Sequence, residues 1–531
     1  MEAMNWWLSF PLHDSLNQDL AIRRFCPERV EQEHGSDESL MEEAMINDFE
    51  LFSPSPHTSS NHHLATSEVD ELIDSFINID DDRNDDNKSP DEHQDFNQDD
   101  MEMEVFSMLE GDDELLMEMR GSSEEDLAGS TEILPPSVNI EQVSSTHGVD
   151  QGLHLVHLLL ACAEAVGCRD TQLADSILGQ VCASSSPWGD SLQRVAYCFA
   201  TGLKSRLSLL QNVNPNGLFT NGGMDVSLIT REEKMEAFQL VYQTTPYVAF
   251  GFMAANEAIS QAAQGKDSLH IIDLGMEHAL QWPSLIRTLA SRPEGPPKIR
   301  ITGLIMEQNL SELGASMKGL IEDAKSQGVS LEFDMVSEPL TPSLLTREKL
   351  NLREGEALFV NGIMHLHKYV KESRGSLKVI LQAIKKLGPT LLTVVEQDAN
   401  HNGPFFLGRF LESLHYYSAI FDSLEASLPR NSPQRLKMER IHFAEEIRNI
   451  VAYEGSDRIE RHERADQWRR QLGRAGFHVM GLKCMSQARM LLSVYGCDGY
   501  TLSLEKGCLL LGWKDRPIML ASAWQVNNIN H

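Results

Sequence analysis

The residues best placed to bind a nucleotide cofactor follow the apolar run His270-Ile-Ile-Asp273, which predicts a buried strand. In Rossmann-type sites such a strand leads into a glycine-rich turn whose backbone N–H groups approach the ligand closely. Here Gly275 is the one glycine in the turn, and the bulky residues 276–278 occupy the space that a cofactor needs. The acidic residue that would hold a ribose is at best Glu307, several residues late. We therefore predict that this turn binds no cofactor.

Histidines are the next candidates for chemistry. His365, His367 and His401 lie near the ends of expected strands, but no acidic or cysteine partner stands at ligand spacing, so we interpret them as solvated loop residues. The sequence contains no H-E-x-x-H, G-x-S-x-G or Walker A pattern. Its eight cysteines include no C-x-x-C pair, which indicates reduced thiols rather than a zinc site or a disulfide framework. We predict no catalytic residue and no metal ligand.

Basic residues gather between positions 458 and 474, where Arg469 and Arg470 are candidates for contact with nucleic-acid phosphates. Glutamates and an aspartate interleave them, which favours the charged face of a helix. A phosphate-contacting patch is the alternative.

The elements that must position these residues are of two kinds. Residues 152–265 show helical periodicity, including 194–210 and 233–261, and predict a helical cap. The chain then alternates strands with helices at 281–290, 310–326, 376–387 and 405–428. The expected strands are residues 269–273, 298–304, 330–333, 357–361, 390–396, 477–482, 500–504, 508–513 and 519–524. Such alternation predicts an α/β fold with a mostly parallel sheet, closed by an antiparallel hairpin whose turn is 505–507. That layout is typical of the methyltransferase-like Rossmann core.

Charge divides the chain before position 151. Residues 1–150 hold 39 acidic and 6 basic residues, a net of −33, whereas residues 151–531 hold 40 and 39, a net of −1. The first part is predicted to be a disordered acidic arm, because it has too little apolar surface to offset its ordering entropy. No run approaches 18 uncharged apolar residues, so we expect a soluble chain without membrane contact.

The arm alternates acids with large apolar residues, among them Phe106, Leu109, Leu115 and Leu116. This composition is typical of segments that fold onto coactivators, with the acids keeping the apolar side chains exposed. A solvating charged tail is the alternative interpretation.

The order of several motifs then resembles the GRAS family of plant regulators. His270-Ile-Ile-Asp273 with Gln281-Trp282-Pro283 is similar to its VHIID block, residues 410–425 are similar to its PFYRE region, and the segments around Trp513 and Trp524 match its SAW motif. The resemblance covers about residues 152–525. Within the family the chain looks closest to the scarecrow-like and DELLA-like branches, with the branch linked to arbuscular mycorrhizal symbiosis as a further candidate.

The resemblance implies a GRAS domain over residues 151–531, with the helical cap mainly in 152–265 and the α/β core in 266–525. It implies a nuclear transcriptional regulator without enzymatic activity or cofactor, acting in plant development or symbiosis. Its expected partners are transcription factors and other GRAS proteins. The resemblance also implies homo- or hetero-dimers formed through the cap, and indirect contact with DNA. The arm lacks a DELLA or TVHYNP motif, so degradation through a gibberellin receptor is not expected.

Several residues of these motifs are candidates for interaction. Leu155, Leu158 and Leu159 fit an L-x-x-L-L docking motif, although burial in the cap or in a dimer interface is the favoured interpretation. Trp282, Trp513 and Trp524 are expected to be core anchors whose indole N–H groups find a partner. Asp273, Arg448 and Glu454 are expected to form buried or interfacial polar pairs.

The leading functional hypothesis is a co-regulator that acts through protein partners. A sequence-specific DNA-binding transcription factor is the alternative. A methyltransferase that uses S-adenosylmethionine is less favoured, because of the turn at Gly275.

Overall fold

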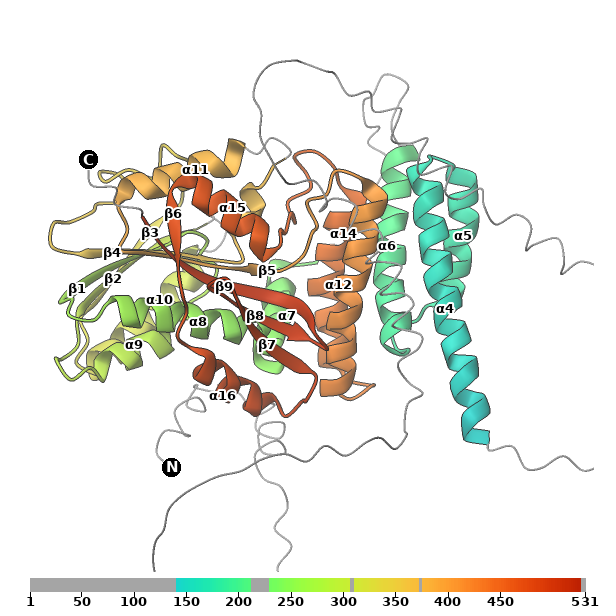
Figure 1. Cartoon of the computed structure of the whole chain (residues 1–531), viewed down its shortest axis with the longest axis horizontal. Coiled ribbons are helices and arrows are strands. Elements are labelled where there is room, and N and C mark those ends of the chain that lie inside the picture. The colour runs from blue at the N-terminus through green and yellow to red at the C-terminus, as the bar shows by residue number, and fades with distance from the viewer. Residues whose placement is uncertain (1–139, 212–228, 306–309, 372–374, 527–531) are drawn as a thin grey trace, which may run out of the picture. The chain divides into compact units, whose positions relative to one another are not determined.

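The computed structural model of the protein describes residues 140–211, 229–305, 310–371 and 375–526 (Figure 1). The predictions of disorder and of a docking segment in the acidic arm fall outside these residues. All described residues belong to one compact unit. Among the described helices, none is both long and apolar enough to cross a membrane.

The centre of the fold is a nine-stranded mixed sheet. Five neighbouring strands run parallel in the order β3-β2-β1-β4-β5. They are β1 (Ser268–Asp273), β2 (Lys298–Leu304), β3 (Leu331–Val336), β4 (Ala357–Ile363) and β5 (Leu391–Gln397). Their bounds follow the expected apolar runs, with β3 reaching three residues further than expected. The mostly parallel α/β sheet is therefore confirmed.

Four antiparallel strands complete the sheet: β6 (Phe477–Met480), β7 (Tyr500–Glu505), β8 (Cys508–Trp513) and β9 (Arg516–Val526). β9 pairs with β5, and its other edge is shared by β8 along the first half and β6 along the second. The expected hairpin is β7–β8, at the edge of the sheet, and its turn has positive φ at Lys506 and Gly507 as a tight hairpin requires. The C-terminal antiparallel addition is confirmed, but it contains more strands than one hairpin.

Helices cover both faces of the sheet, with α8, α9 and α10 on one side and α11 and α15 on the other (Figure 1). Their bounds are α8 (Pro246–Ala262), α9 (Trp282–Ala290), α10 (Leu310–Ser326), α11 (Gly375–Leu387) and α15 (Ala465–Ala475), with α16 (Met485–Tyr495) beside α8. α8 is apolar on almost every side and contacts β4, β5 and β9. Gly251 permits this approach, because a Cβ there would lie 2.6 Å from Val395 Cγ1.

The helical cap differs from the expectation in two respects. Its long helices are α4 (Ile140–Gly167), α5 (Thr171–Ser184), α6 (Ser191–Gln211), α12 (Phe406–Ser427) and α14 (Ala444–Ala452). The last two come from the second half of the chain, and both pack on α6. The expected single helical run 233–261 is instead α7 (Arg231–Thr244) and α8, interrupted at Thr245, because Pro246 has no N–H to donate. α8 packs against the sheet, so it belongs to the core layer.

Candidate functional site

The turn after β1 is filled by the protein's own side chains. A Cβ placed on Gly275 would lie 2.0 Å from His365 Nδ1, so the His365 imidazole rests directly on the backbone of the turn. Met276 is buried, and a Cβ on Gly303 of β2 would lie 2.8 Å from its sulfur. The side chains of His365 and Met276 therefore lie against the backbone of these two glycines. A methyltransferase-like fold would hold its ligand at this position.

A closed network of buried amide groups lies beside this turn. Gln281 Nε2 donates to Asn256 Oδ1 at 3.0 Å, and Asn361 Nδ2 donates to Gln281 Oε1 at 2.9 Å. Thr393 Oγ1 donates to Asn361 Oδ1 at 2.7 Å. These four side chains are buried and satisfy one another, so Gln281 ties α8 and the start of α9 to β4 rather than facing a ligand.

Asp273 ends β1 and is 7% exposed. Its Oδ1 accepts a hydrogen bond from the Gly275 N–H at 3.3 Å. Burial raises the pKa of its carboxyl to about 7, although hydrogen bonds from Gly275 and Asn361 oppose the rise. Asp273 has no arginine or lysine in ion-pair contact among the described residues, so its polar partners are the Gly275 N–H and the Asn361 side chain.

Because of this raised pKa, we expect Asp273→Asn to stabilise the protein at alkaline pH. Between about pH 4 and pH 7 the folded state retains a proton that the unfolded state has lost, so the wild-type stability falls as pH rises through this window. The variant lacks that loss and should exceed the wild type by on the order of 1–3 kcal/mol at pH 8, with the difference vanishing near pH 4. Urea unfolding at both pH values measures it. Equal stability at pH 8 would contradict the burial of a charge at this position.

The remaining residues of the VHIID and SAW segments are mostly structural. His270 Nε2 forms a hydrogen bond with Thr302 Oγ1 at 2.8 Å, and its Nδ1 lies 2.9 Å from the Arg300 guanidinium. Burial lowers the pKa of His270 to about 4. Pro283 is the second residue of α9, in the first turn, where a missing N–H costs nothing. The indole N–H groups of Trp513 and Trp524 donate to Asp422 (2.6 Å) and Ser522 (2.9 Å).

Trp282 departs from the expectation for the three tryptophans. Its side chain is fully buried, but its indole nitrogen has no hydrogen-bond partner among the described residues. The apolar packing of the ring against its surroundings therefore has to outweigh the cost of the unsatisfied N–H.

The candidate docking leucines lie on the inner side of the cap. Leu155 and Leu159 of α4 are buried and Leu158 is half-buried, while α4 packs against α5, α6 and α12. In this state the three leucines are not presented to a partner groove.

Glu454 links separate parts of the cap. Its carboxylate pairs with Arg206 of α6 at 3.0 Å and with Arg409 of α12 at 2.5 Å. Arg448 pairs instead with Glu445, one turn earlier in α14, at 2.6 Å. The two residues therefore make separate interactions, and Glu454 is the one that joins elements far apart in the sequence.

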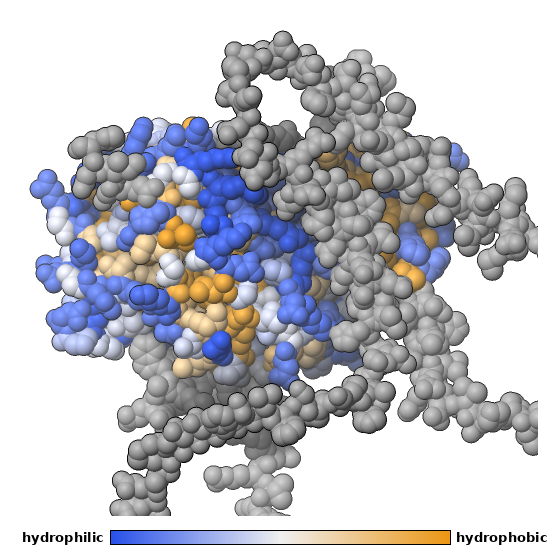
Figure 2. Space-filling view, viewed as in Figure 1, coloured by the Kyte–Doolittle hydropathy of each residue, from blue (hydrophilic) through white to orange (hydrophobic). Residues whose placement is uncertain are grey.

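The basic segment is only partly the helix face that we expected. Arg458 and Arg461 precede α15 and are buried, because their guanidinium groups donate to loop carbonyls such as those of His401 and Gly455. Arg469 of α15 pairs with Asp466 at 3.1 Å, and Arg470 donates to Gln467 at 2.7 Å. Figure 2 shows hydrophilic side chains over this part of the surface. Arg469 and Arg470 thus have acceptors within their own helix.

A buried cluster of histidines and glutamates lies at the ends of β4 and β5, and it corrects the prediction that His367 and His401 are solvated. Glu396 of β5 accepts the backbone N–H groups of residues 365–367 at 2.7–3.2 Å. Its second oxygen lies 2.6 Å from His367 Nδ1. Because the Glu396 carboxylate accepts these backbone N–H groups, the short helix Leu366–Tyr369 lies against β5 and His367 is 3% exposed.

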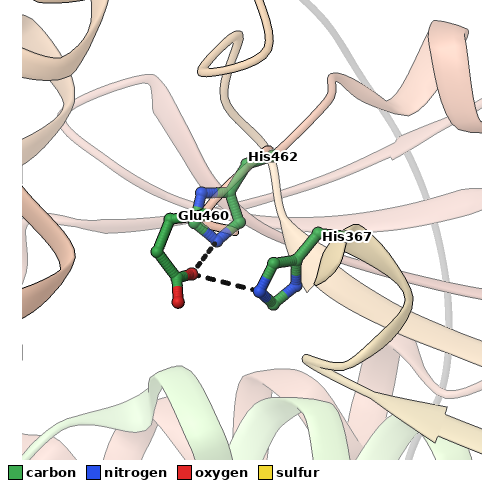
Figure 3. A group of neighbouring side chains, drawn as sticks. All are labelled: His367, Glu460 and His462. Carbon is green, nitrogen blue, oxygen red and sulfur yellow. Dashed lines mark ion pairs between the residues drawn. The ribbon is translucent and has the colours of Figure 1, made fainter. Parts of the chain in front are cut away.

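The other ring nitrogen of His367 faces the segment before α15. His367 Nε2 lies 3.1 Å from Glu460 Oε2, and His462 Nε2 lies 3.3 Å from the same oxygen (Figure 3). His462 Nδ1 lies 3.0 Å from His401 Nδ1. Burial lowers the pKa of His367, but Glu396 and Glu460 outweigh burial and raise it to about 9.

His367, Glu460 and His462 are the group in the described part of the chain whose ligand atoms lie close enough to hold a metal ion, within 4.8 Å of one another. Residue spacing does not reveal this group, because the three residues come from two loops far apart in the chain. The one local signal was the pair Glu460 and His462, two positions apart within a charged segment.

Comparison with known proteins gives consistent matches. The chain matches the GRAS domain family over residues 155–525. It is 46% identical to the GRAS family protein RAD1 of Lotus japonicus over 407 residues, which covers 75% of this chain and 79% of that protein. It is 39% identical to the DELLA protein RGL1 of Arabidopsis thaliana, covering 73% and 74% of the two chains. The solved structure of SCL7 from Oryza sativa superimposes with a TM-score of 0.62 at 31% identity, covering 70% of this chain and 99% of that one.

Proposed function

This chain is a member of the GRAS family and therefore a non-enzymatic transcriptional regulator, and from that premise we propose that it works in the nucleus as a co-regulator that binds other proteins. The folded domain recruits transcription factors and other GRAS proteins. The acidic arm contacts coactivators. The similarity to RAD1 and DELLA proteins supports a role in plant development or symbiosis.

The observation that carries this proposal is the closed turn after β1. His365 and Met276 occupy the place where a methyltransferase-like fold would hold a cofactor, and the amide groups beside it bond to one another. Among the described residues the turn that follows β1 is filled in this way, which supports a role in binding proteins rather than a cofactor.

The cap provides an exposed apolar surface for such partners. Where the cap end of the molecule is visible in Figure 2, hydrophobic side chains lie beside hydrophilic ones. The large apolar residues exposed on or beside the cap helices are Leu153, Leu173, Trp188, Phe405 and Leu407. Exposed large apolar side chains are candidates for contact with a protein partner. We propose that this cap surface forms homo- or hetero-dimers with GRAS proteins.

We expect Leu173→Asp to weaken self-association of the full chain, because a charge at an apolar interface loses its hydration without gaining a partner. The dissociation constant, measured by sedimentation equilibrium, should rise at least about tenfold, the equivalent of roughly 1.4 kcal/mol. Val379→Asp on α11 is the matched control, since Val379 is 47% exposed and Leu173 is 49% exposed. Equal dissociation constants for the two variants, or a wild type that stays monomeric, would remove the cap from the proposal.

A further inference from the structure

The cluster at the end of β4 brings three possible metal-ligand atoms within 4.8 Å of one another. Two ligand atoms that are each about 2.0–2.1 Å from a tetrahedral ion lie roughly 3.3 Å apart. The distances from Glu460 Oε2 to His367 Nε2 and to His462 Nε2 are 3.1 and 3.3 Å. Figure 3 shows both imidazole rings turned edge-on toward the one carboxylate oxygen.

The outer nitrogens of both rings are also held as metal-bound histidines require. His367 Nδ1 lies 2.6 Å from Glu396 Oε2, and His462 Nδ1 lies 3.0 Å from His401 Nδ1. With hydrogen on each Nδ1, Glu396 and the His401 ring accept, and each Nε2 can offer a lone pair to an ion. Metal binding then releases the proton that His367 Nε2 shares with Glu460 in the metal-free protein. A carboxylate behind a ligating histidine is the usual arrangement that fixes its tautomer and orientation. Glu396 is itself fixed by three backbone N–H groups.

The inner nitrogens are poorly served by the protein alone. His367 Nε2 and His462 Nε2 converge on the same carboxylate oxygen of Glu460, and neither contact has good hydrogen-bond geometry. Both rings are almost fully buried. A cation placed between the three atoms would satisfy both lone pairs and the carboxylate at once.

We propose that His367, Glu460 and His462 bind a divalent transition-metal ion, with zinc as the best fit. Two imidazoles and one carboxylate suit zinc and cobalt, whereas calcium and magnesium prefer sets made of oxygen ligands. The carboxylates of Glu396 and Glu460 balance the two charges of the ion. Glu460 keeps 14% of its side chain exposed, which gives the ion a route from solvent.

The bound ion would act as a structural pin. His367 lies in the short helix after β4, whereas Glu460 and His462 lie in the segment that joins α14 of the cap to α15 of the core. Binding therefore fastens the cap-to-core connection onto the sheet. A network of protons in place of the ion is the competing occupant of the same geometry.

The test uses the full chain, stripped with a chelator and titrated with Zn²⁺. We expect the wild type to bind about one equivalent of Zn²⁺, with a lower dissociation constant than His462→Gln. Zinc should raise the melting temperature of the wild type but not that of this variant. His478→Gln is the matched control, because His478 is an exposed histidine on β6. The wild type and the two variants share the remaining histidines of the chain. A difference in zinc affinity between the wild type and His462→Gln therefore does not come from those histidines. Glu396→Gln should lower the affinity about 10- to 100-fold while keeping the ligands.

X-ray absorption of the zinc-loaded wild type keeps the proposal testable if a variant does not fold. We expect two imidazoles and oxygen around the ion, without sulfur. Equal tight binding by the wild type and His462→Gln, no tight binding at all, or a first shell without two imidazoles would each overturn the site in favour of the proton network.

Discussion

Arg194→Ala should destabilise the domain by about 3–5 kcal/mol, the usual cost of removing one partner of a buried ion pair. Arg194 lies on α6 with no exposed side-chain surface. Its Nε donates to both oxygens of Glu439 at 3.0 and 3.1 Å, and its Nη1 lies 2.5 Å from Glu425. Glu439 belongs to the π-helical turn before α14 and Glu425 to α12, so one guanidinium joins three elements of the cap.

The loss should depend on pH. Burial raises the pKa of Glu439 to about 7 even though Arg194 opposes it. Without Arg194 the pKa of this carboxyl should rise further, although Arg435 still lies 3.6 Å from it, so the variant should lose more stability at pH 8 than at pH 6. Urea unfolding at the two pH values measures the effect. Arg353→Ala breaks an ion pair between Arg353 and Glu332 on the surface and should leave the urea midpoint of unfolding unchanged. A small loss for Arg194→Ala at pH 8 would show that this pair does not hold the cap.

Replacing Phe106, Leu109, Leu115 and Leu116 of the arm by alanine should abolish transcriptional activation. The substitutions leave the net charge of −33 in residues 1–150 unchanged, so only the apolar side chains that would dock on a coactivator are lost. The measurement is a reporter gene driven by the full chain fused to a heterologous DNA-binding domain. Activity should fall to that of the DNA-binding domain alone.

The same experiment separates the two interpretations of the arm. A chain lacking residues 1–150 sets the baseline, and immunoblotting shows that each fusion is present. If the arm is only a solvating tail, the four-alanine variant will match the wild type. Activity that persists even without residues 1–150 would place activation in the folded domain.

Most of the sheet could be predicted because its strands are short apolar runs between turn residues. β2 and β8 begin and end where the sequence indicated, and the turn at Lys506 and Gly507 follows from local backbone preference. The break at Thr245 was missed because the helical periodicity on both sides of Pro246 is strong. Pro246 does indicate the break, because a proline disfavours the helical conformation of the residue before it.

Long-range pairings account for the rest of what was missed. Nothing local in α12 or α14 indicates that they pack on α6, where Gly202 brings the backbone close to Val451. Arg458 and Arg461 could not be predicted to be buried, because their acceptors are backbone carbonyls. Every residue has such a carbonyl, so this interaction leaves no pattern in the sequence. The histidine cluster depends on loops that only the folded sheet brings together. Interactions of this kind are fixed by topology, so residue spacing does not reveal them.

The cofactor position of this fold is closed by the protein's own side chains. Calorimetric titration of the full chain with S-adenosylmethionine tests this closure. We expect no saturable heat, because His365 and Met276 occupy the turn at Gly275. Saturable binding with a micromolar dissociation constant would contradict the claim.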